Sequence, residues 1–391
     1  MSVFKKAISV ILAILAVLSC IALPISAESI EKEPLPVPSV SAKSAILMLA
    51  STGEILYQKD CDLKLPMAST TKIMTALVAL ELGSPEQMIT ASPEAVGVEG
   101  SSIYLTVGEQ LSLEQLLYAL LLESANDAAV AIACGLSGSV DSFAEKMNEK
   151  AGSLGLVQTH FTNPHGLDHE EHYTTARELA IITQALLEEP LLRTIVSTRK
   201  TTIPHDGTDS VRLLVNHNKM LRLYDGCIGV KTGFTKRSGR CLVSAAERDG
   251  VELIAVTLNA SDDWNDHTAL LNYGFSRYDA VKLCNTEEYL FPLPVVGGID
   301  DYVMIGNTEA LQAILPVHHG SIVVRVEAPR FAYADVSEGD RIGSVIFLCD
   351  VESSGSLQKI GEVELTARYS VKKKKVKRSF WQWLKSLFGF H

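Results

Sequence analysis

The chain has 391 residues, of which 47% are hydrophobic and 21% charged, so it can bury at least one large core. Its length favours two domains, and its composition excludes wholesale disorder. The formal net charge is −11; the last 20 residues carry +7, so the preceding 371 carry −18. Such an acidic body argues against a nucleic-acid-binding protein.

The N-terminus has the pattern of a secretory signal peptide, which we place at residues 1–27. Lys5 and Lys6 precede an apolar run from Ala7 to Leu23, and small residues at its end suit cleavage. Two alternatives fit less well, a retained membrane anchor and lipid attachment at Cys20. Removal of the signal leaves six cysteines at irregular spacing, for which we expect free buried thiols in preference to disulfides.

A proline-rich linker is predicted at 28–43, followed by a domain of mixed α and β structure at 44–283. This domain opens with a strand hairpin, 45–49 and 55–57, around the turn Ser51-Thr52-Gly53-Glu54. Apolar periodicity and two capping boxes, at Ser112 and Thr175, predict helices. The helices lie at 69–82, 112–122, 127–134, 140–154 and 175–187. Strands follow at 228–231, 240–246 and 251–258. We therefore expect a largely antiparallel sheet flanked by helices.

Beyond residue 283, short β-branched segments separated by Gly, Asp or Pro predict a small all-β domain at 284–370. The tail at 371–391 is basic and then aromatic. On a helix its apolar residues share one face, namely Phe380, Trp383, Leu384, Leu387 and Phe388. The tail is too short to span a bilayer, and a basic amphipathic helix suits an anionic lipid surface. We expect peripheral membrane docking in preference to a disordered charged end.

The first candidate motif is Ser69-Thr70-Thr71-Lys72, in which residues three apart share one helical face. A serine hydroxyl needs a base to become a nucleophile. Lys72 can be that base only if burial or a nearby cation such as Lys231 disfavours its charged form. Free N–H groups at the helix start can also stabilise an oxyanion. The alternative is that Ser69 is only a helix cap.

Two further motifs are weak when taken alone. Ser124-Ala125-Asn126 lies between two helices, where it could cap the second one or point a hydroxyl and an amide into a cleft. Lys231-Thr232-Gly233 follows an apolar strand, where the lysine is either a solvated edge charge or a cation that holds a substrate carboxylate. Gly233 permits close approach of a backbone.

The three motifs occur together and in this order, which is far more specific than any one of them. On these residues the chain resembles the serine D-alanyl-D-alanine carboxypeptidases, which are low-molecular-mass penicillin-binding proteins. The resemblance covers about 44–283 and includes the longer segments 67–76, 124–129, 163–167 and 231–235. It implies a penicillin-binding/β-lactamase-like transpeptidase domain. It also implies an exported enzyme, peripheral on the extracytoplasmic face of a bacterial cell membrane.

The resemblance implies catalytic roles for three residues. Lys72, uncharged, takes the proton of Ser69, which attacks the carbonyl of the penultimate D-alanine in a peptidoglycan stem peptide. Ser124 relays a proton to the departing D-alanine, and water then hydrolyses the acyl-enzyme. β-Lactams are expected to acylate the same serine, and no metal or cofactor is expected.

The resemblance also implies a set of substrate-binding residues. Asn126 would hold the substrate backbone, while Lys231 and Thr232 would bind the terminal carboxylate. The backbone N–H groups of Ser69 and Phe234 would form the oxyanion hole. Gly233, between Thr232 and Phe234, belongs to the same binding strand.

One feature departs from the resemblance, because many relatives carry an arginine after Lys-Thr-Gly that assists carboxylate binding. Here the later region, 261–267, is acidic, and Arg240 is nearby without an assigned role. A serine β-lactamase is the first alternative function. Its Glu-x-x-Leu-Asn stretch has no match, since Glu178 begins Glu-Leu-Ala-Ile. The second alternative, a non-catalytic penicillin-binding wall protein, is disfavoured because all the catalytic polar positions are present.

Four histidines crowd one segment, at positions 160, 165, 169 and 172. His169-Glu170-Glu171-His172 fits no zinc-protease motif. Asn163, Pro164 and Gly166 are turn-forming residues. We therefore expect a polar loop near the cleft in preference to a metal site.

Overall fold

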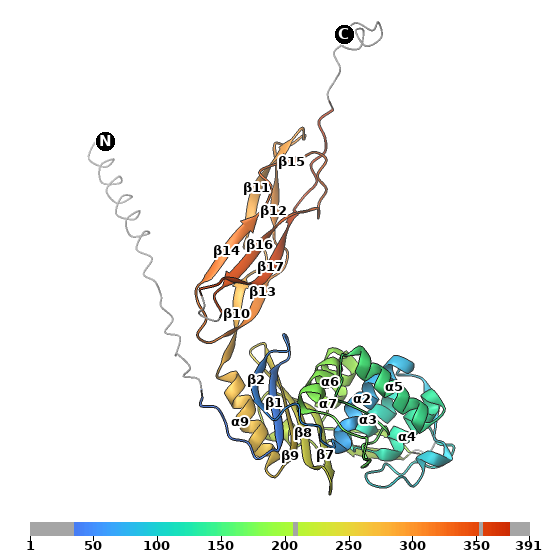
Figure 1. The fold of residues 1–391 in the computed structure, drawn as a ribbon. Helices are drawn as coiled ribbons and strands as arrows, with labels where there is room; N and C mark the ends of the chain where they lie inside the picture. The colour runs from blue at the N-terminus through green and yellow to red at the C-terminus, as the bar shows by residue number, and fades with distance from the viewer. Residues whose placement is uncertain (1–34, 206–209, 352–354, 376–391) are drawn as a thin grey trace, which may run out of the picture. The chain divides into compact units, whose positions relative to one another are not determined.

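The computed structural model describes residues 35–205, 210–351 and 355–375. The predicted signal peptide, the start of the linker and most of the predicted membrane-docking tail lie outside these ranges. The described residues form a mixed α/β region and a separate all-β region, which confirms the predicted fold class (Figure 1). Within them, no helix has the length and apolar character that a membrane crossing requires.

A five-stranded antiparallel sheet forms the centre of the α/β region, in the order β2-β1-β9-β8-β7. The strands are β1 (Ser44–Leu49), β2 (Ile55–Lys59), β7 (Cys227–Thr235), β8 (Gly239–Arg248) and β9 (Val251–Ala260). Successive side chains of a strand point to opposite faces. In β1 and β9 most residues of both sets are apolar and buried, because helices cover both faces of the sheet.

The larger helical layer packs on one face of this sheet, and α9 (Asp263–Phe275) packs on the other (Figure 1). The larger layer contains α2 (Lys72–Leu82), α3 (Leu113–Leu122), α4 (Asn126–Ser137), α5 (Val140–Ser153), α6 (Ala176–Glu188) and α7 (Pro190–Ser197). Smaller elements are β3 (Met88–Thr90), η2 (Pro93–Ala95), β4 (Gln110–Ser112), β5 (Lys200–Pro204), β6 (Val211–Val215) and α8 (Met220–Leu223). Apolar residues on most sides bury α2 and α3 in this layer.

The local signals of the sequence predict most of these elements. The Ser112 capping box is present in full, with Ser112 accepting from the Gln115 N–H and Gln115 accepting from the Ser112 N–H. The Thr175 box is only half formed, because the Glu178 carboxylate turns to another loop. The predicted helix 69–82 is also different, since its first turn is a separate 3-10 helix, η1 (Ala68–Thr71).

The all-β region contains a six-stranded sheet in the order β14-β16-β17-β12-β11-β15. Its strands are β11 (Leu290–Val296), β12 (Tyr302–Gly306), β14 (Ile322–Glu327), β15 (Ala332–Tyr333), β16 (Arg341–Cys349) and β17 (Gln358–Ala367). Buried apolar residues such as Val303, Phe347 and Leu365 form its core. The predicted boundary at 283/284 falls within β10 (Tyr278–Cys284), which pairs with β13 (Leu311–Pro316). The domain limits stay predictions.

Six cysteines lie in the described residues, and all six are free thiols, although Cys134 and Cys227 are only partly buried where buried thiols were expected. Four of them are buried, namely Cys61, Cys241, Cys284 and Cys349.

Candidate active site

Ser69 lies in η1, a turn held in place by its own threonines. Thr70 Oγ1 donates to the Met67 carbonyl oxygen at 2.6 Å, and Thr71 Oγ1 donates to the Ala68 carbonyl oxygen at 2.8 Å. Ala68 has φ of +49°, a left-handed conformation that is costly for a residue with a Cβ. The turn therefore fixes a strained backbone directly before Ser69, whose side chain lines an open cleft.

Lys72 is the first residue of α2 and is fully buried. Its Nζ lies 3.2 Å from Ser69 Oγ, 2.7 Å from Asn126 Oδ1 and 2.6 Å from the His165 carbonyl oxygen. All three partners are neutral oxygen atoms. Burial lowers the pKa of Lys72 well below its ordinary value, and the Lys231 ammonium lowers that pKa further. The sequence-derived requirement for a lysine base, an environment that disfavours its charge, is thus met.

The three oxygen partners of Lys72 suit the three donors of an ammonium, and an uncharged amine, the form that burial favours, can also make these contacts. A neutral amine has two N–H donors and one lone pair, whereas an ammonium has three donors and no acceptor. The two shorter contacts, to Asn126 Oδ1 and the His165 carbonyl, can take the two N–H groups. The lone pair is then left for the hydroxyl of Ser69.

The histidine-rich segment supports η1 from behind. His172 is buried, and its Nδ1 accepts from the Thr162 N–H at 3.1 Å. Its Nε2 therefore carries the proton and donates to Thr71 Oγ1 at 2.8 Å. Burial and the neighbouring histidines lower the pKa of His172 to about 3, so the ring stays neutral. A Cβ on Gly166, where φ is +89°, would lie 2.0 Å from the Ala68 carbonyl oxygen, so only glycine permits this packing.

These histidines act as the predicted polar loop beside the cleft. The His165 carbonyl contacts Lys72, and the His172 ring contacts Thr71. In the described parts of the chain, no group of three or more His, Cys, Asp or Glu side chains is arranged to hold a metal ion.

Ser124 and Asn126 lie at the junction between α3 and α4. Ser124 has φ of +60°, and its side chain lines the cleft together with that of Ser69. Asn126 is buried; its Oδ1 accepts from Lys72, and its Nδ2 donates to the Glu99 carbonyl oxygen at 2.5 Å. One N–H of this amide is left for another acceptor, so the substrate-binding role expected for Asn126 stays a prediction.

Asp127, for which the sequence alone predicts no role, anchors the loop that forms another wall of the cleft. Its carboxylate accepts from the N–H groups of Ile103 and Leu105 and from the Ser102 hydroxyl at 2.6 Å. Ser101, next to this anchored segment, lines the cleft. The sequence signal for this role is an aspartate that directly follows the Ser-x-Asn motif and lies in the first turn of a helix, α4.

The Lys-Thr-Gly motif lies within edge strand β7, which continues past it to Thr235. Lys231 is 1% exposed, and burial lowers its pKa to about 7. Its Nζ donates to the Thr232 carbonyl oxygen at 3.0 Å. A Cβ on Gly233 would lie 3.1 Å from both the Met67 carbonyl oxygen and the Ser69 nitrogen. The structure therefore brings this strand against the serine turn, as close backbone approach at Gly233 predicts.

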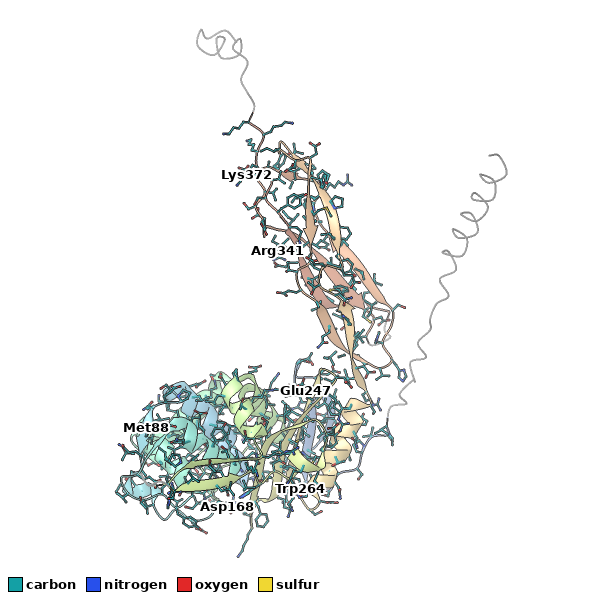
Figure 2. The ribbon with its side chains drawn as sticks, turned by 180° about the vertical axis from the view of Figure 1, so that it is seen from behind. Met88, Asp168, Glu247, Trp264, Arg341 and Lys372 are labelled. Atoms are coloured by element: carbon teal, nitrogen blue, oxygen red, sulfur yellow. The ribbon has the colours of Figure 1, made fainter. Side chains whose placement is uncertain are left out.

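The cleft between these elements has a volume of about 440 Å³ and is lined on one side by residues from β8 and α9. Arg240 pairs with Phe234 across β7 and β8, and its Nε lies 3.0 Å from the buried carboxylate of Asp263. Trp264, labelled in Figure 2, follows Asp263 at the start of α9 and also lines the cleft. The acidic stretch 261–267 thus begins a helix, where carboxylates suit the N-terminal turn.

Glu178, the carboxylate weighed for a β-lactamase, has a structural role. It accepts from the N–H groups of Val157 and Gln158 at 2.9 Å and from the Thr159 hydroxyl at 2.5 Å. It therefore anchors the start of the histidine-rich segment instead of activating a water molecule in the cleft.

The sequence is similar to those of D-alanyl-D-alanine carboxypeptidases. Residues 29–262 match the family model described as D-alanyl-D-alanine carboxypeptidase. D-alanyl-D-alanine carboxypeptidase DacF of Bacillus subtilis is 31% identical over 358 residues, which cover 89% of this chain and 89% of that protein. The D-alanyl-D-alanine carboxypeptidase of Streptomyces sp. K15 is 36% identical over 61% of this chain and 89% of its own length. The structure of penicillin binding protein 5 from Haemophilus influenzae matches 87% of this chain and 100% of its own, with a TM-score of 0.63 and 27% identity.

Proposed function

The chain belongs to the D-alanyl-D-alanine carboxypeptidase family of serine peptidases, and we propose that Ser69 is the residue through which it forms its acyl-enzyme. The observation that carries this proposal is the contact between Ser69 Oγ and the buried Nζ of Lys72, at 3.2 Å. Lys72, as a neutral amine, takes the Ser69 proton while Oγ attacks the carbonyl carbon of the penultimate D-alanine.

The oxyanion that forms is stabilised by the N–H groups of Ser69 and Phe234. A Cβ on Gly233 would lie 3.1 Å from the Ser69 nitrogen, so the next N–H along β7 lies close to that of Ser69. Fixed donors aimed at a developing charge cost no reorganisation during the reaction. The peptide C–N bond then breaks, the departing D-alanine amine receives a proton from Lys72 through Ser124, and the acyl group stays on Ser69.

Deacylation repeats these steps with water in place of the serine. Lys72, again neutral, takes a proton from water as the oxygen attacks the ester carbonyl, and the proton passes to Ser69 Oγ as the ester bond breaks. Asn126 is a positioning residue in both halves, because its Oδ1 lies 2.7 Å from Lys72 Nζ. Its remaining N–H is available for a carbonyl of the substrate backbone.

The terminal carboxylate of the substrate binds to Lys231, Thr232 and Arg240. Thr232 and Arg240 both line the cleft, and antiparallel pairing puts them on neighbouring strands of the sheet. Asp263 holds the guanidinium by one N–H and leaves its other donors free for a carboxylate. Arg240 thereby replaces the cation that the acidic stretch 261–267 lacks. A β-lactam presents a similar amide and carboxylate and acylates the same serine.

The substrate is the stem peptide of peptidoglycan, and the enzyme acts after export, on the extracytoplasmic face of the cell membrane. The sequence of the first 27 residues supports export, and the basic amphipathic tail supports peripheral docking. Residues 1–371, which precede the tail, carry a net charge of −18, and this charge argues against a nucleic-acid partner.

The test is release of D-alanine from a peptide that ends in D-Ala-D-Ala, with and without benzylpenicillin. Ser69→Ala abolishes release, and benzylpenicillin blocks the unchanged enzyme. Ser51→Ala, in the exposed turn between β1 and β2, is the matched control and keeps full activity. Release that persists in the Ser69→Ala protein would remove Ser69 from the mechanism.

A further inference from the structure

We propose that one end of the all-β region is a second membrane-contacting surface, which places aromatic and aliphatic side chains in the headgroup region of an anionic bilayer. We call this end the tip; it comprises residues 296–302, which are the turn between β11 and β12 with one flanking residue on each side, the segment 330–335 with β15, and Lys372–Lys375. The inference rests on the membrane association proposed above and adds to the tail a surface of the folded body.

The tip is built by pairing of segments that are distant in the sequence. Val296 of β11 pairs with Tyr333 of β15 in a parallel register. The lysine run is attached to the turn by backbone hydrogen bonds, since the Ile299 N–H donates to the Lys372 carbonyl at 2.8 Å and the Lys374 N–H donates to the Gly297 carbonyl at 2.8 Å. The lysines therefore have a fixed place beside the turn. Figure 2 shows Lys372 at this end of the region, beyond Arg341.

Large apolar side chains of the tip lie open to solvent. Their exposed fractions run from 45% for Phe331 to 70% for Tyr333, with Val296, Ile299 and Tyr302 between these values. The Phe331 and Tyr333 rings contact each other edge to face, with centroids 5.3 Å apart. Clustered exposed apolar groups indicate an interaction site. Tyrosine and phenylalanine beside lysine match the headgroup region, where rings are half buried and cations meet lipid phosphates.

The charge of the tip fits an anionic partner. Five cations lie here, Arg330 and Lys372–Lys375, all exposed. The facing acids are Asp300, Asp301 and Asp335, and Asp335 accepts a hydrogen bond from the Lys373 N–H. The balance of five cations and three acids is +2, in a chain whose net charge is −11. The chain continues from Lys375 into the basic amphipathic tail, so the tip adjoins the one segment that the sequence already predicts to lie on lipid.

The same region supplies a matched control surface. Edge strand β14 exposes three apolar side chains, Val323, Val324 and Val326, by 42–45%, which is close to the exposure of Phe331. Arg325 lies between Val324 and Val326, and Glu327 follows, without a run of lysines. If exposure alone decided membrane binding, both surfaces would contribute.

The experiment measures co-sedimentation of the full mature chain with vesicles of phosphatidylcholine and phosphatidylglycerol, at several anionic fractions. We expect the variant Ile299→Ser/Phe331→Ser/Tyr333→Ser to bind about tenfold more weakly or worse. The control Val323→Ser/Val324→Ser/Val326→Ser binds like the unchanged protein, and both keep D-alanine release. Equal binding by the tip variant and the unchanged protein overturns the proposal.

Two further arms separate this proposal from the one on which it rests. If Trp383→Ser/Leu384→Ser abolishes binding while the tip variant retains it, the tail docks and the tip does not. If the unchanged protein binds at none of the anionic fractions, both the docking of the tail and the contact of the tip are refuted. If the tip variant loses activity, the variant Tyr333→Trp is measured instead, with vesicles that contain brominated lipids, which quench tryptophan fluorescence. Stronger quenching in Tyr333→Trp than in the control Val324→Trp supports contact of the tip with the bilayer. Equal quenching in the two variants refutes it.

Discussion

Replacing Lys231 by methionine should stabilise the folded protein while it impairs the enzyme. Burial lowers the pKa of Lys231 from its ordinary 10.5 to about 7. The unfolded chain therefore binds this proton more tightly than the folded chain does, which costs about 4 kcal/mol of stability at pH 7. Loss of the hydrogen bond to the Thr232 carbonyl offsets about 1 kcal/mol of the gain. The net expected gain is about 3 kcal/mol.

The pH dependence of this gain has a definite sign. A lysine whose folded pKa is lowered destabilises the protein most at pH values below that pKa, and the penalty disappears as the pH approaches 10.5. The advantage of Lys231→Met should fall from about 4 kcal/mol at pH 6 to about 1 kcal/mol at pH 9. Denaturant unfolding of both proteins at these two pH values measures it.

Acylation by a labelled β-lactam provides the functional half of the same experiment. Lys231→Met removes both the cation for the substrate carboxylate and the charge that lowers the pKa of Lys72. We expect acylation at least about 100-fold slower at pH 7. A variant that is less stable than the unchanged protein at pH 6, or a gain that does not vary with pH, would refute the reasoning.

Three other substitutions test neighbouring parts of the site. Arg240→Leu should raise KM for a D-Ala-D-Ala peptide about tenfold with a smaller change in kcat, whereas Arg237→Leu, an exposed arginine of the same hairpin, should change neither. His172→Phe should lower kcat about tenfold at unchanged KM, because it removes the support of Thr71; a KM effect of equal size would contradict a positioning role. Gly166→Ala should cost about 3 kcal/mol or more in thermal or denaturant unfolding, while Gly152→Ala, on an open face of α5, should be neutral or slightly stabilising.

Local sequence patterns, such as helix caps and runs of strand-forming residues, predict the helices and strands that carry these patterns. The Ser112 capping box fixes the start of α3, and the strands predicted at 240–246 and 251–258 correspond to β8 and β9 within a residue or two at each end. From the sequence, the acidic stretch 261–267 shows only that an expected arginine is absent, and no helix is predicted there. It is the N-terminal turn of α9, where Asp263 also holds Arg240.

The residues of the site also fall into two groups, those that local sequence rules bring together and those that only tertiary packing brings together. Spacing alone brings Lys72 beside Ser69, because one helical turn separates them. No local rule puts β7 against η1, since the sequence indicates only that Gly233 permits the close approach of some backbone segment. The roles of His172 and Asp127 depend on contacts with Thr71 and with the 101–105 loop, which tertiary packing creates. Such partners have no signature in a single sequence.

The most direct test of the mechanism is to locate the covalent bond itself. The purified protein is treated with benzylpenicillin, digested with trypsin and analysed by mass spectrometry. We predict one penicilloyl group per chain, on the peptide 65–72 and at Ser69, and none in the Lys72→Met protein. A group on Ser124 instead, or D-alanine release without any adduct on this peptide, would contradict the account.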